Sequence, residues 1–261
     1  MDTQYFALMR IQEDAELLSR RFAELAQRAE QMEHACFTGF LSPPEAEWAQ
    51  NAGKKQGVSV RLNGGYEDAE RQMACFVPAE EETPAFPLSA LKLTWPHQTA
   101  PTHRDVLGSV MALGLKRQCI GDIVMGEGCA YLFAESAMSS HIADMLLSAG
   151  RTHLQVEISE ELPLITPAEG TEVRDTVLTT RLDAVLAAGF GLSRAKAAEL
   201  IAAGNVKLRH LPTERSDARV TQGDAISARG YGRLVLTQVG EPTKKGRLPL
   251  ILTRYGEKRG R

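Results

Sequence analysis

Residues 179–224 read TTRLDAVLAAGFGLSRAKAAELIAAGNVKLRHLPTERSDARVTQGD. The stretch predicts two short helices joined by a turn that contains glycine, followed by strand-like segments. In the first helix, apolar residues recur on one face at helical spacing: Leu182, Val185, Leu186 and Phe190. The second helix has Ser193 in a good capping position. The stretch therefore indicates a small domain with two helices packed on a sheet.

Both predicted helices begin with cations, where the helix dipole favours anions. We expect Thr179 or Thr180 to cap the first helix, with Arg181 directly after. In the second helix, Arg194 and Lys196 lie in the first turn. An exposed cation there costs roughly 0.3–1 kcal/mol. Each one alone is an ordinary solvated charge, but the same feature in two helices favours a phosphate-binding surface.

The charge of the chain is divided unevenly. Residues 1–175 hold 14 Lys and Arg against 26 Asp and Glu, a net charge of −12. Residues 176–261 hold 16 against 7, a net charge of +9. This division indicates an acidic body attached to a module that binds a polyanion.

The succession RLD, SRxxA, LIxxGxVxL and GD resembles the RNA-binding domain of small-subunit ribosomal protein S-four, the αL motif. In that resemblance Gly204 is a turn between helix and strand, and Gly223-Asp224 is the turn before a strand at 225–229. The family usually has Asn-Gly or Asn-Trp where this chain has Arg209-His210, so the local turn is left open. The resemblance implies RNA contacts from Arg181, Ser193, Arg194, Lys196 and Lys207. We add Arg209, Arg233, Lys244 and Lys245 as candidate RNA-binding residues of the basic domain.

The front of the chain predicts helices and a hairpin. Apolar spacing indicates a helix within residues 1–35, and a second helix is expected at Glu45–Ala52 after Gly39 and the Pro43-Pro44 pair. Strands are expected at Val58–Leu62 and Arg71–Val77, with Asn63-Gly64-Gly65 as a turn signal.

Residues 91–158 alternate in the order βαββαβ, which predicts a ferredoxin-like plait. The expected elements are strand 91–95, helix 103–115, strand 120–125, strand 130–134, helix 136–149 capped by Ser136 and ended by Gly150, and strand 153–158. Residues 159–172 are expected to connect the plait to the basic domain. The fold class is therefore α+β, with domains at 1–78, 88–160 and 173–261.

Two further stretches, GGYEDAERQMACFVP at 64–78 and HRDVLGSVMALGLKRQCIGDIV at 103–124, resemble the YlmH family of bacterial RNA-binding proteins. The resemblance covers almost the whole chain. It implies binding to the large ribosomal subunit through rRNA or tRNA, rescue of stalled subunits that carry peptidyl-tRNA, and a genetic link to cell division. We accordingly expect a cytoplasmic, ribosome-associated monomer that binds structured RNA.

Catalytic, metal and cofactor readings find little support in the sequence. His103-Arg104-Asp105 is similar to a kinase catalytic loop, but no Gly-rich phosphate loop or Asp-Phe-Gly accompanies it. The four cysteines form no CxxC pair, and no HExxH is present. We therefore expect no metal, no cofactor and no enzyme activity, and reduced cysteines in a cytosolic protein. Secondary RNA candidates are His103, Arg104, Lys116 and Arg117, with Lys116-Arg117 equally explained as cations that end a helix.

The alternative function is an RNA-modifying enzyme, a pseudouridine synthase or methyltransferase, that uses the basic domain to hold its substrate. The sequence has no GxGxG methyl-donor loop and no obvious GRLD pseudouridylation segment. Tyr131 and Phe133 lie two apart on a strand, as base-stacking aromatics do, but we interpret them as core. No signal peptide or membrane span is expected.

The apolar segment Leu248–Thr253 is too hydrophobic for a free tail. We expect it to add a strand beside Arg233–Val239. That pairing would hold Lys244–Arg247 in an ordered turn near the RNA surface and leave only Glu257–Arg261 mobile.

Overall fold

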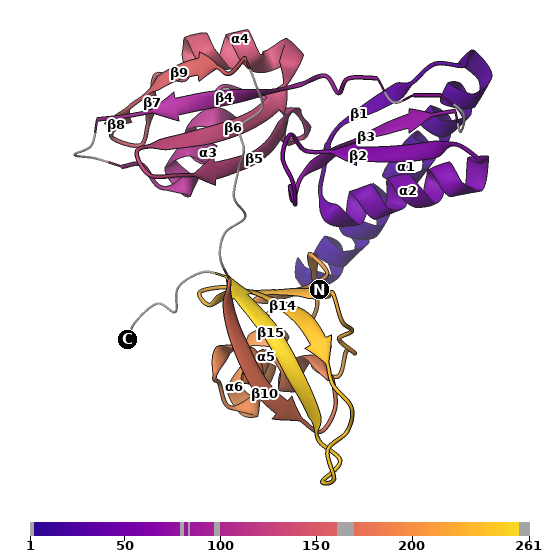
Figure 1. Cartoon of the computed structure of the whole chain (residues 1–261), viewed down its shortest axis with the longest axis vertical. Coiled ribbons are helices and arrows are strands. Elements are labelled where there is room, and N and C mark those ends of the chain that lie inside the picture. Colours follow the sequence, from indigo (N-terminus) through magenta and orange to yellow (C-terminus); the bar gives the residue numbers. More distant parts are fainter. Residues whose placement is uncertain (1–2, 79–80, 83, 97–99, 161–169, 256–261) are drawn as a thin grey trace. The chain divides into compact units, whose positions relative to one another are not determined.

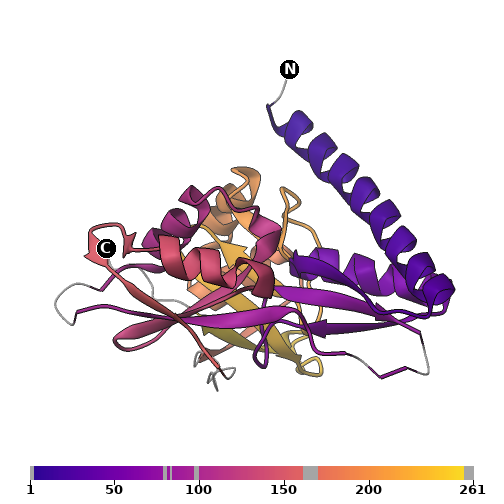
Figure 2. The same ribbon diagram turned by 90° about the horizontal axis from the view of Figure 1, so that it is seen from above.

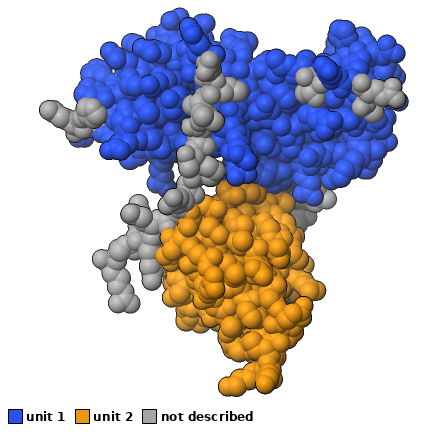
Figure 3. Space-filling model, viewed as in Figure 1, with its two compact units in different colours: residues 1–166 blue, residues 167–261 orange. Residues whose placement is uncertain are grey.

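The computed structural model describes residues 3–78, 81–82, 84–96, 100–160 and 170–255, with side chains from residue 15 onward. The chain divides into two compact units, residues 1–166 and 167–261 (Figure 3). No helix in the described part is long and apolar enough to cross a membrane. All four cysteines are free thiols.

In the N-terminal part of unit 1, two helices pack against a three-stranded antiparallel sheet (Figures 1 and 2). The helices are α1 (Thr3–Met32) and α2 (Pro43–Gln56), and the sheet runs in the order β1 (Cys36–Leu41), β3 (Gln72–Val77), β2 (Ser59–Asn63). Phe22 of α1 is buried against Phe76 of β3, with ring centroids 6.3 Å apart. The strand β1 was not predicted, because Gly39 interrupts its apolar pattern.

A four-stranded antiparallel sheet with two helices forms the rest of unit 1. Its elements are β4 (Leu88–Thr94), α3 (His103–Ala112), β5 (Ile120–Met125), β6 (Cys129–Glu135), α4 (Ser136–Met145) and β9 (Gln155–Ile158). The strand order is β5-β6-β4-β9. A short 3₁₀ helix, η1 (Arg117–Cys119), precedes β5, and a hairpin of β7 (Ser148–Ala149) and β8 (Thr152–His153) precedes β9.

Both helices of this part are shorter than predicted. The helix α3 ends at Ala112, so Lys116 and Arg117 do not end it, and they lie at the start of η1 instead. The helix α4 begins after Glu135 as its N-cap and ends at Met145. Gly150, with φ of 60°, turns the β7–β8 hairpin rather than ending α4. The helical spacing of apolar residues continues through residues 146–149. In the structure, residues 148–149 pair with residues 152–153 in a hairpin, and this pairing ends the helix early.

The two faces of this sheet have different partners. Leu91, Leu93 and Leu132 face α3 and α4 and form a core with them. Phe133 faces the other way, where it stacks on Tyr66 at 5.1 Å between ring centroids, and Tyr131 packs half-buried in the same cluster. The core interpretation holds for Phe133, but its covering comes from the front part of unit 1 rather than from the helices.

Unit 2 has two short helices packed on a six-stranded sheet. The helices are α5 (Leu182–Phe190) and α6 (Arg194–Ala202), and the sheet runs β10 (Thr171–Val177), β15 (Leu248–Tyr255), β14 (Gly232–Val239), β13 (Ala225–Ala228), β11 (Val206–Leu208), β12 (Leu211–Pro212). The core joins Leu182, Ile201, Leu234 and Leu252 with residues of every major element.

The predicted C-terminal strand is confirmed, since β15 pairs antiparallel with β14. It also pairs with β10, so it lies inside the sheet rather than at its edge. The strand β10 begins at Thr171, within the segment expected to be a connection. The residues 257–261 that were expected to be mobile lie outside the described part.

Candidate nucleic-acid interface

A carboxylate at the start of α5 gathers two arginines. Asp183 is buried, and its oxygens accept hydrogen bonds from Arg181 Nε at 3.1 Å and Arg194 Nη2 at 2.8 Å. Burial raises the pKa of this carboxyl, but the bonds from Arg181 and Arg194 outweigh burial and hold the pKa below its ordinary value. The arginine side chains stay 42% and 60% exposed, so their remaining N–H groups can reach a ligand.

The start of α5 differs from the prediction in one respect. Arg181 itself is the N-cap, with extended backbone, and neither Thr179 nor Thr180 caps the helix. Asp183 supplies an anion in the first turn, which the prediction of an uncompensated cationic start overlooked. Arg181 and Arg194 are therefore oriented by one acidic residue, Asp183.

A second carboxylate holds another arginine. Asp224 accepts a bidentate pair from Arg209, Nε at 2.7 Å and Nη2 at 2.8 Å, together with the amide and hydroxyl of Thr221. Burial raises the pKa of Asp224, yet the Arg209 and Thr221 bonds leave it lowered. The Arg209 side chain remains 54% exposed.

Arg219 connects the two carboxylate sites. Its backbone forms a bridge with Arg181, and its carbonyl lies 3.4 Å from Nη2 of Arg209. Arg215 lies earlier in the same loop, with its Nε 3.5 Å from Oδ1 of Asp217. We call Arg181, Arg194, Arg209, Arg215 and Arg219 the arginine surface. Arg215 and Arg219 were missed in the sequence, although the run ERSDAR at 214–219 carried a signal of charge.

The turn between β11 and β12 is a two-residue hairpin of Arg209 and His210. Both residues have left-handed backbone, with φ of 52° and 66°. Such turns favour Asn-Gly, and a larger residue held at positive φ costs on the order of 1–3 kcal/mol. The bidentate bond from Arg209 to Asp224 helps to hold this turn. The substitution in the family pattern thus places a cation at the tip of an otherwise regular hairpin.

The α6 start behaves largely as predicted. Ser193 is the N-cap, and its hydroxyl accepts from the amide of Lys196 at 3.1 Å. The Lys196 ammonium lies 3.0 Å from Glu199 on the exposed surface of α6, an ion pair worth little in water.

Other predicted contact residues lie on the strands and the last hairpin. Lys207 is exposed on β11, in register with Ser227, which is in turn in register with Arg233 on β14. Arg233 is half-buried and lies 6.0 Å from the centre of the Tyr255 ring, so packing occupies part of its guanidinium.

Lys244 and Lys245 lie at the exposed tip of the β14–β15 hairpin (Figure 1). The turn is ordered as expected, since Thr243 donates to the Arg247 carbonyl at 2.8 Å. Arg247 also binds Thr176 of β10 and lines, with Arg194, a groove of about 370 Å³. The hairpin base therefore adjoins one end of the arginine surface.

The secondary candidates in unit 1 are all exposed: His103, Arg104, Lys116 and Arg117. Partial desolvation lowers the pKa of His103, the charge of Arg117 lowers it further, and the charge of Asp122 raises it. His103 therefore lies close to both Arg117 and Asp122. No group of three His, Cys, Asp or Glu side chains in the described ranges is placed to hold a metal ion.

Comparison with known proteins identifies the domains. The family descriptions that match are "YlmH, N-terminal" at residues 13–80, "Putative RNA-binding domain in YlmH" at residues 79–161, and "S4 domain" at residues 180–226. "Ribosome-associated protein quality control protein P2" of Bacillus subtilis (strain 168) is 36% identical over 213 residues, covering 80% of this chain and 82% of that protein. The chain belongs to the YlmH family.

Among solved structures, "Cell division protein ylmH from Streptococcus pneumoniae" matches with 20% identity and a TM-score of 0.49, over 56% of this chain and 91% of that one. In this YlmH-family chain, the whole arginine surface falls within the S4 match, as does Lys207. Arg233, Lys244 and Lys245 lie beyond its end at residue 226, while His103 and Arg117 lie in the preceding domain.

Proposed function

We propose that this chain is a non-catalytic, monomeric RNA-binding protein of the cytoplasm. It would bind the large ribosomal subunit through rRNA or tRNA and act in quality control of stalled peptidyl-tRNA complexes. The name of the Bacillus subtilis relative supports the setting, and the link to cell division is retained from the resemblance to the YlmH family.

The arginine surface is the observation that carries this proposal. Arginine binds phosphate through paired N–H groups of fixed geometry. Asp183 binds Arg181 and Arg194, and Asp224 binds Arg209, while all three side chains stay partly exposed. Because these arginines are already oriented, less side-chain entropy is lost when an RNA phosphate binds them. Affinity would come largely from counterion release and would fall steeply with salt.

We further propose three domains at 1–78, 88–160 and 173–261, the last extended to include β10 from Thr171. The strand order β5-β6-β4-β9 supports a ferredoxin-like plait for the middle domain. None of the three matched families is named as a pseudouridine synthase or a methyltransferase, so we do not extend the proposal to RNA modification.

Co-sedimentation of the full chain with purified large ribosomal subunits tests the proposal. Arg219→Ala removes an exposed cation from the middle of the arginine surface, and the matched control Arg174→Ala removes one from β10. We expect Arg219→Ala to weaken binding and to lower the slope of log affinity against log salt by about 1, with little change for the control. Binding that is absent, or that ignores salt, would contradict the proposal.

A further inference from the structure

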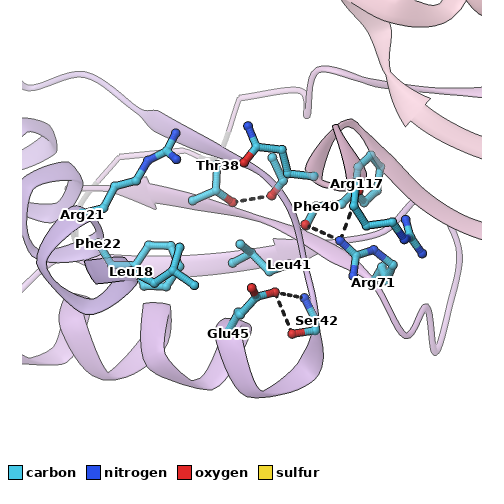
Figure 4. Close-up of a pocket in the computed structure, with 12 residues that line it drawn as sticks. Leu18, Arg21, Phe22, Thr38, Phe40, Leu41, Ser42, Glu45, Arg71 and Arg117 are labelled. Carbon is cyan, nitrogen blue, oxygen red and sulfur yellow. Dashed lines mark hydrogen bonds between the residues drawn. The ribbon is translucent and has the colours of Figure 1, made fainter. Parts of the chain in front are cut away.

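A cavity in unit 1 carries a second cluster of arginines. It has a volume of about 250 Å³ and lies between α1, β1, the start of α2 and η1 (Figure 4). Its lining includes the side chains of Arg21, Arg71 and Arg117 but only one carboxylate, that of Glu45. The cavity thus has local positive charge within a strongly acidic part of the chain.

Two of these arginines stand side by side on one wall. Arg71 donates to the carbonyls of Ile120 at 3.0 Å and Phe40 at 2.8 Å, and Arg117 also donates to the Ile120 carbonyl. Two guanidinium groups that share one acceptor repel each other. Burial lowers the pKa of Arg117, and the charge of Arg71 lowers it further, although Asp122 offsets part of this. A bound anion would relieve the repulsion.

The single carboxylate of the lining is already engaged. One oxygen of Glu45 accepts from the amide and the hydroxyl of Ser42, each at 2.6 Å, and so closes the start of α2. Arg21 stands on α1, across the cavity from Arg71 and Arg117 (Figure 4). Its side chain is exposed and, within the described part of the chain, forms no hydrogen bond or ion pair. Arg21 can therefore turn to a ligand without breaking a hydrogen bond or ion pair in the described part of the chain.

The remaining surfaces of the cavity suit a small organic group. Leu18, Phe22 and Leu41 supply an apolar floor. Gly39 allows η1 to approach β1, because a Cβ at this position would lie 2.7 Å from the Gln118 carbonyl oxygen. The volume falls below the roughly 300–1,000 Å³ of sites for drug-sized ligands. It fits a phosphate with its sugar better than a large cofactor.

We infer that this cavity binds one phosphate of an RNA backbone together with the adjoining ribose. Arg71 and Arg117 contact the phosphate oxygens, the apolar floor receives the sugar, and Arg21 closes the opposite side. The inference rests on the proposed function and deepens it, since it gives unit 1 an RNA contact separate from the arginine surface.

The test compares neighbouring arginines of α1 in the full chain. Arg21 lines the cavity, whereas the exposed Arg20 does not. Binding to purified large subunits is expected to weaken about 3- to 10-fold for Arg21→Ala, and its salt slope to fall by about 1, with a smaller effect for Arg20→Ala. Arg117→Lys keeps the charge but loses the paired N–H geometry, and should weaken binding in the same direction.

The outcomes separate the inference from the proposed function. If Arg21→Ala binds like Arg20→Ala while Arg219→Ala still weakens binding, the inference is overturned and the proposed function stands. If all three bind like the parent chain, both fail. Calorimetric titration with inorganic phosphate and with adenosine monophosphate addresses a free ligand. Micromolar binding of either that requires Arg21, with subunit binding unaffected by Arg21→Ala, would overturn the assignment to RNA.

Discussion

The carboxylates of Asp183 in unit 2 and Asp122 in unit 1 accept hydrogen bonds from different kinds of donor. Asp183 accepts from Arg181 and Arg194, whose side chains remain exposed. Asp122 accepts hydrogen bonds from the hydroxyl of Tyr66 at 2.9 Å and from the backbone amides of Glu70 and Arg71. In the first case cations stay at the surface with part of their hydrogen-bonding capacity unused. In the second, the carboxylate of β5 is bound to the connection between β2 and β3, where it serves a structural contact.

The kind of hydrogen-bond donor that an acidic side chain binds therefore distinguishes a candidate binding surface from a structural contact. The Tyr66 pKa is raised, by burial first and by Asp122 next, so its phenol stays protonated and keeps donating. The following changes test this distinction, from the largest expected effect to the smallest.

Ending the chain before Lys244 removes β15, which pairs with both β14 and β10. Leu250 and Leu252 leave the core of unit 2 with it. We expect a loss of more than about 4 kcal/mol, enough to abolish cooperative unfolding of unit 2, with RNA binding lost as well. Thermal melts of this chain and of one lacking only residues 257–261 provide the comparison. An unchanged melting temperature for the shorter chain would refute the pairing.

Asp122→Ala leaves Tyr66 and two amides without their acceptor. The Tyr66 and Arg71 donors are half-buried and the Glu70 amide is exposed, so losing their charged acceptor costs about 2–4 kcal/mol in total. We expect unit 1 to melt earlier while the unit 2 transition and its RNA contacts are unchanged. Asp144→Ala, at an exposed position of α4, is the matched control. Equal melting of the two variants would show that the structural contact contributes nothing.

Asp183→Asn keeps the shape of the side chain but removes the charge that binds Arg181 and Arg194. The folded-state pKa of Asp183 is lowered, so its stabilisation is complete above the unfolded value of about 3.9 and disappears as pH falls through the folded value. We expect about 1–2 kcal/mol of destabilisation near neutral pH, and a difference from the parent chain that begins to shrink as the pH falls below about 4. Urea unfolding across pH measures this, with the exposed Glu214→Gln as control. A difference that grows in acid would contradict the assignment.

Arg194→Ala with Lys196→Ala should change stability by less than about 1 kcal/mol, because relief of the helix dipole and loss of the Arg194 bond to Asp183 oppose each other. RNA binding should nevertheless weaken, with a salt slope lowered by about 1 to 2. Arg151→Ala with Arg174→Ala removes the same charge elsewhere. Filter binding at several salt concentrations distinguishes the pairs, and equal losses would mean that only net charge matters.

Local sequence patterns predicted the elements whose signals are local. The sequence correctly predicted Ser193 as the N-cap of α6 and both ends of β5. The missed strands depend on distant partners. The edge strand β10 is mostly exposed and pairs with a segment far along the chain, so it has no alternation of its own. In β1, Gly39 serves an approach to η1 that no local pattern encodes.

The candidate site shows the same division. The cations of the arginine surface could largely be named from sequence, because helix starts and a family resemblance mark Arg181 and Arg194. Their orientation could not, because it depends on which carboxylate each one reaches. Asp224 lies fifteen residues from Arg209 along the chain, and only the folded sheet brings them together.

The place of β15 in the sheet has a consequence for the order in which this unit can be made. Thr171 of β10 pairs with Arg254 of β15, so the first strand of the unit to be synthesised has no partner until the last one exists. The helices and β11–β14 can form from nearby contacts, but β10 must wait on a pairing of high contact order, which is slow. During translation, the pairing of β10 with β15 is therefore the last step in forming the sheet of this unit. The rest of the unit can fold before its first strand is paired.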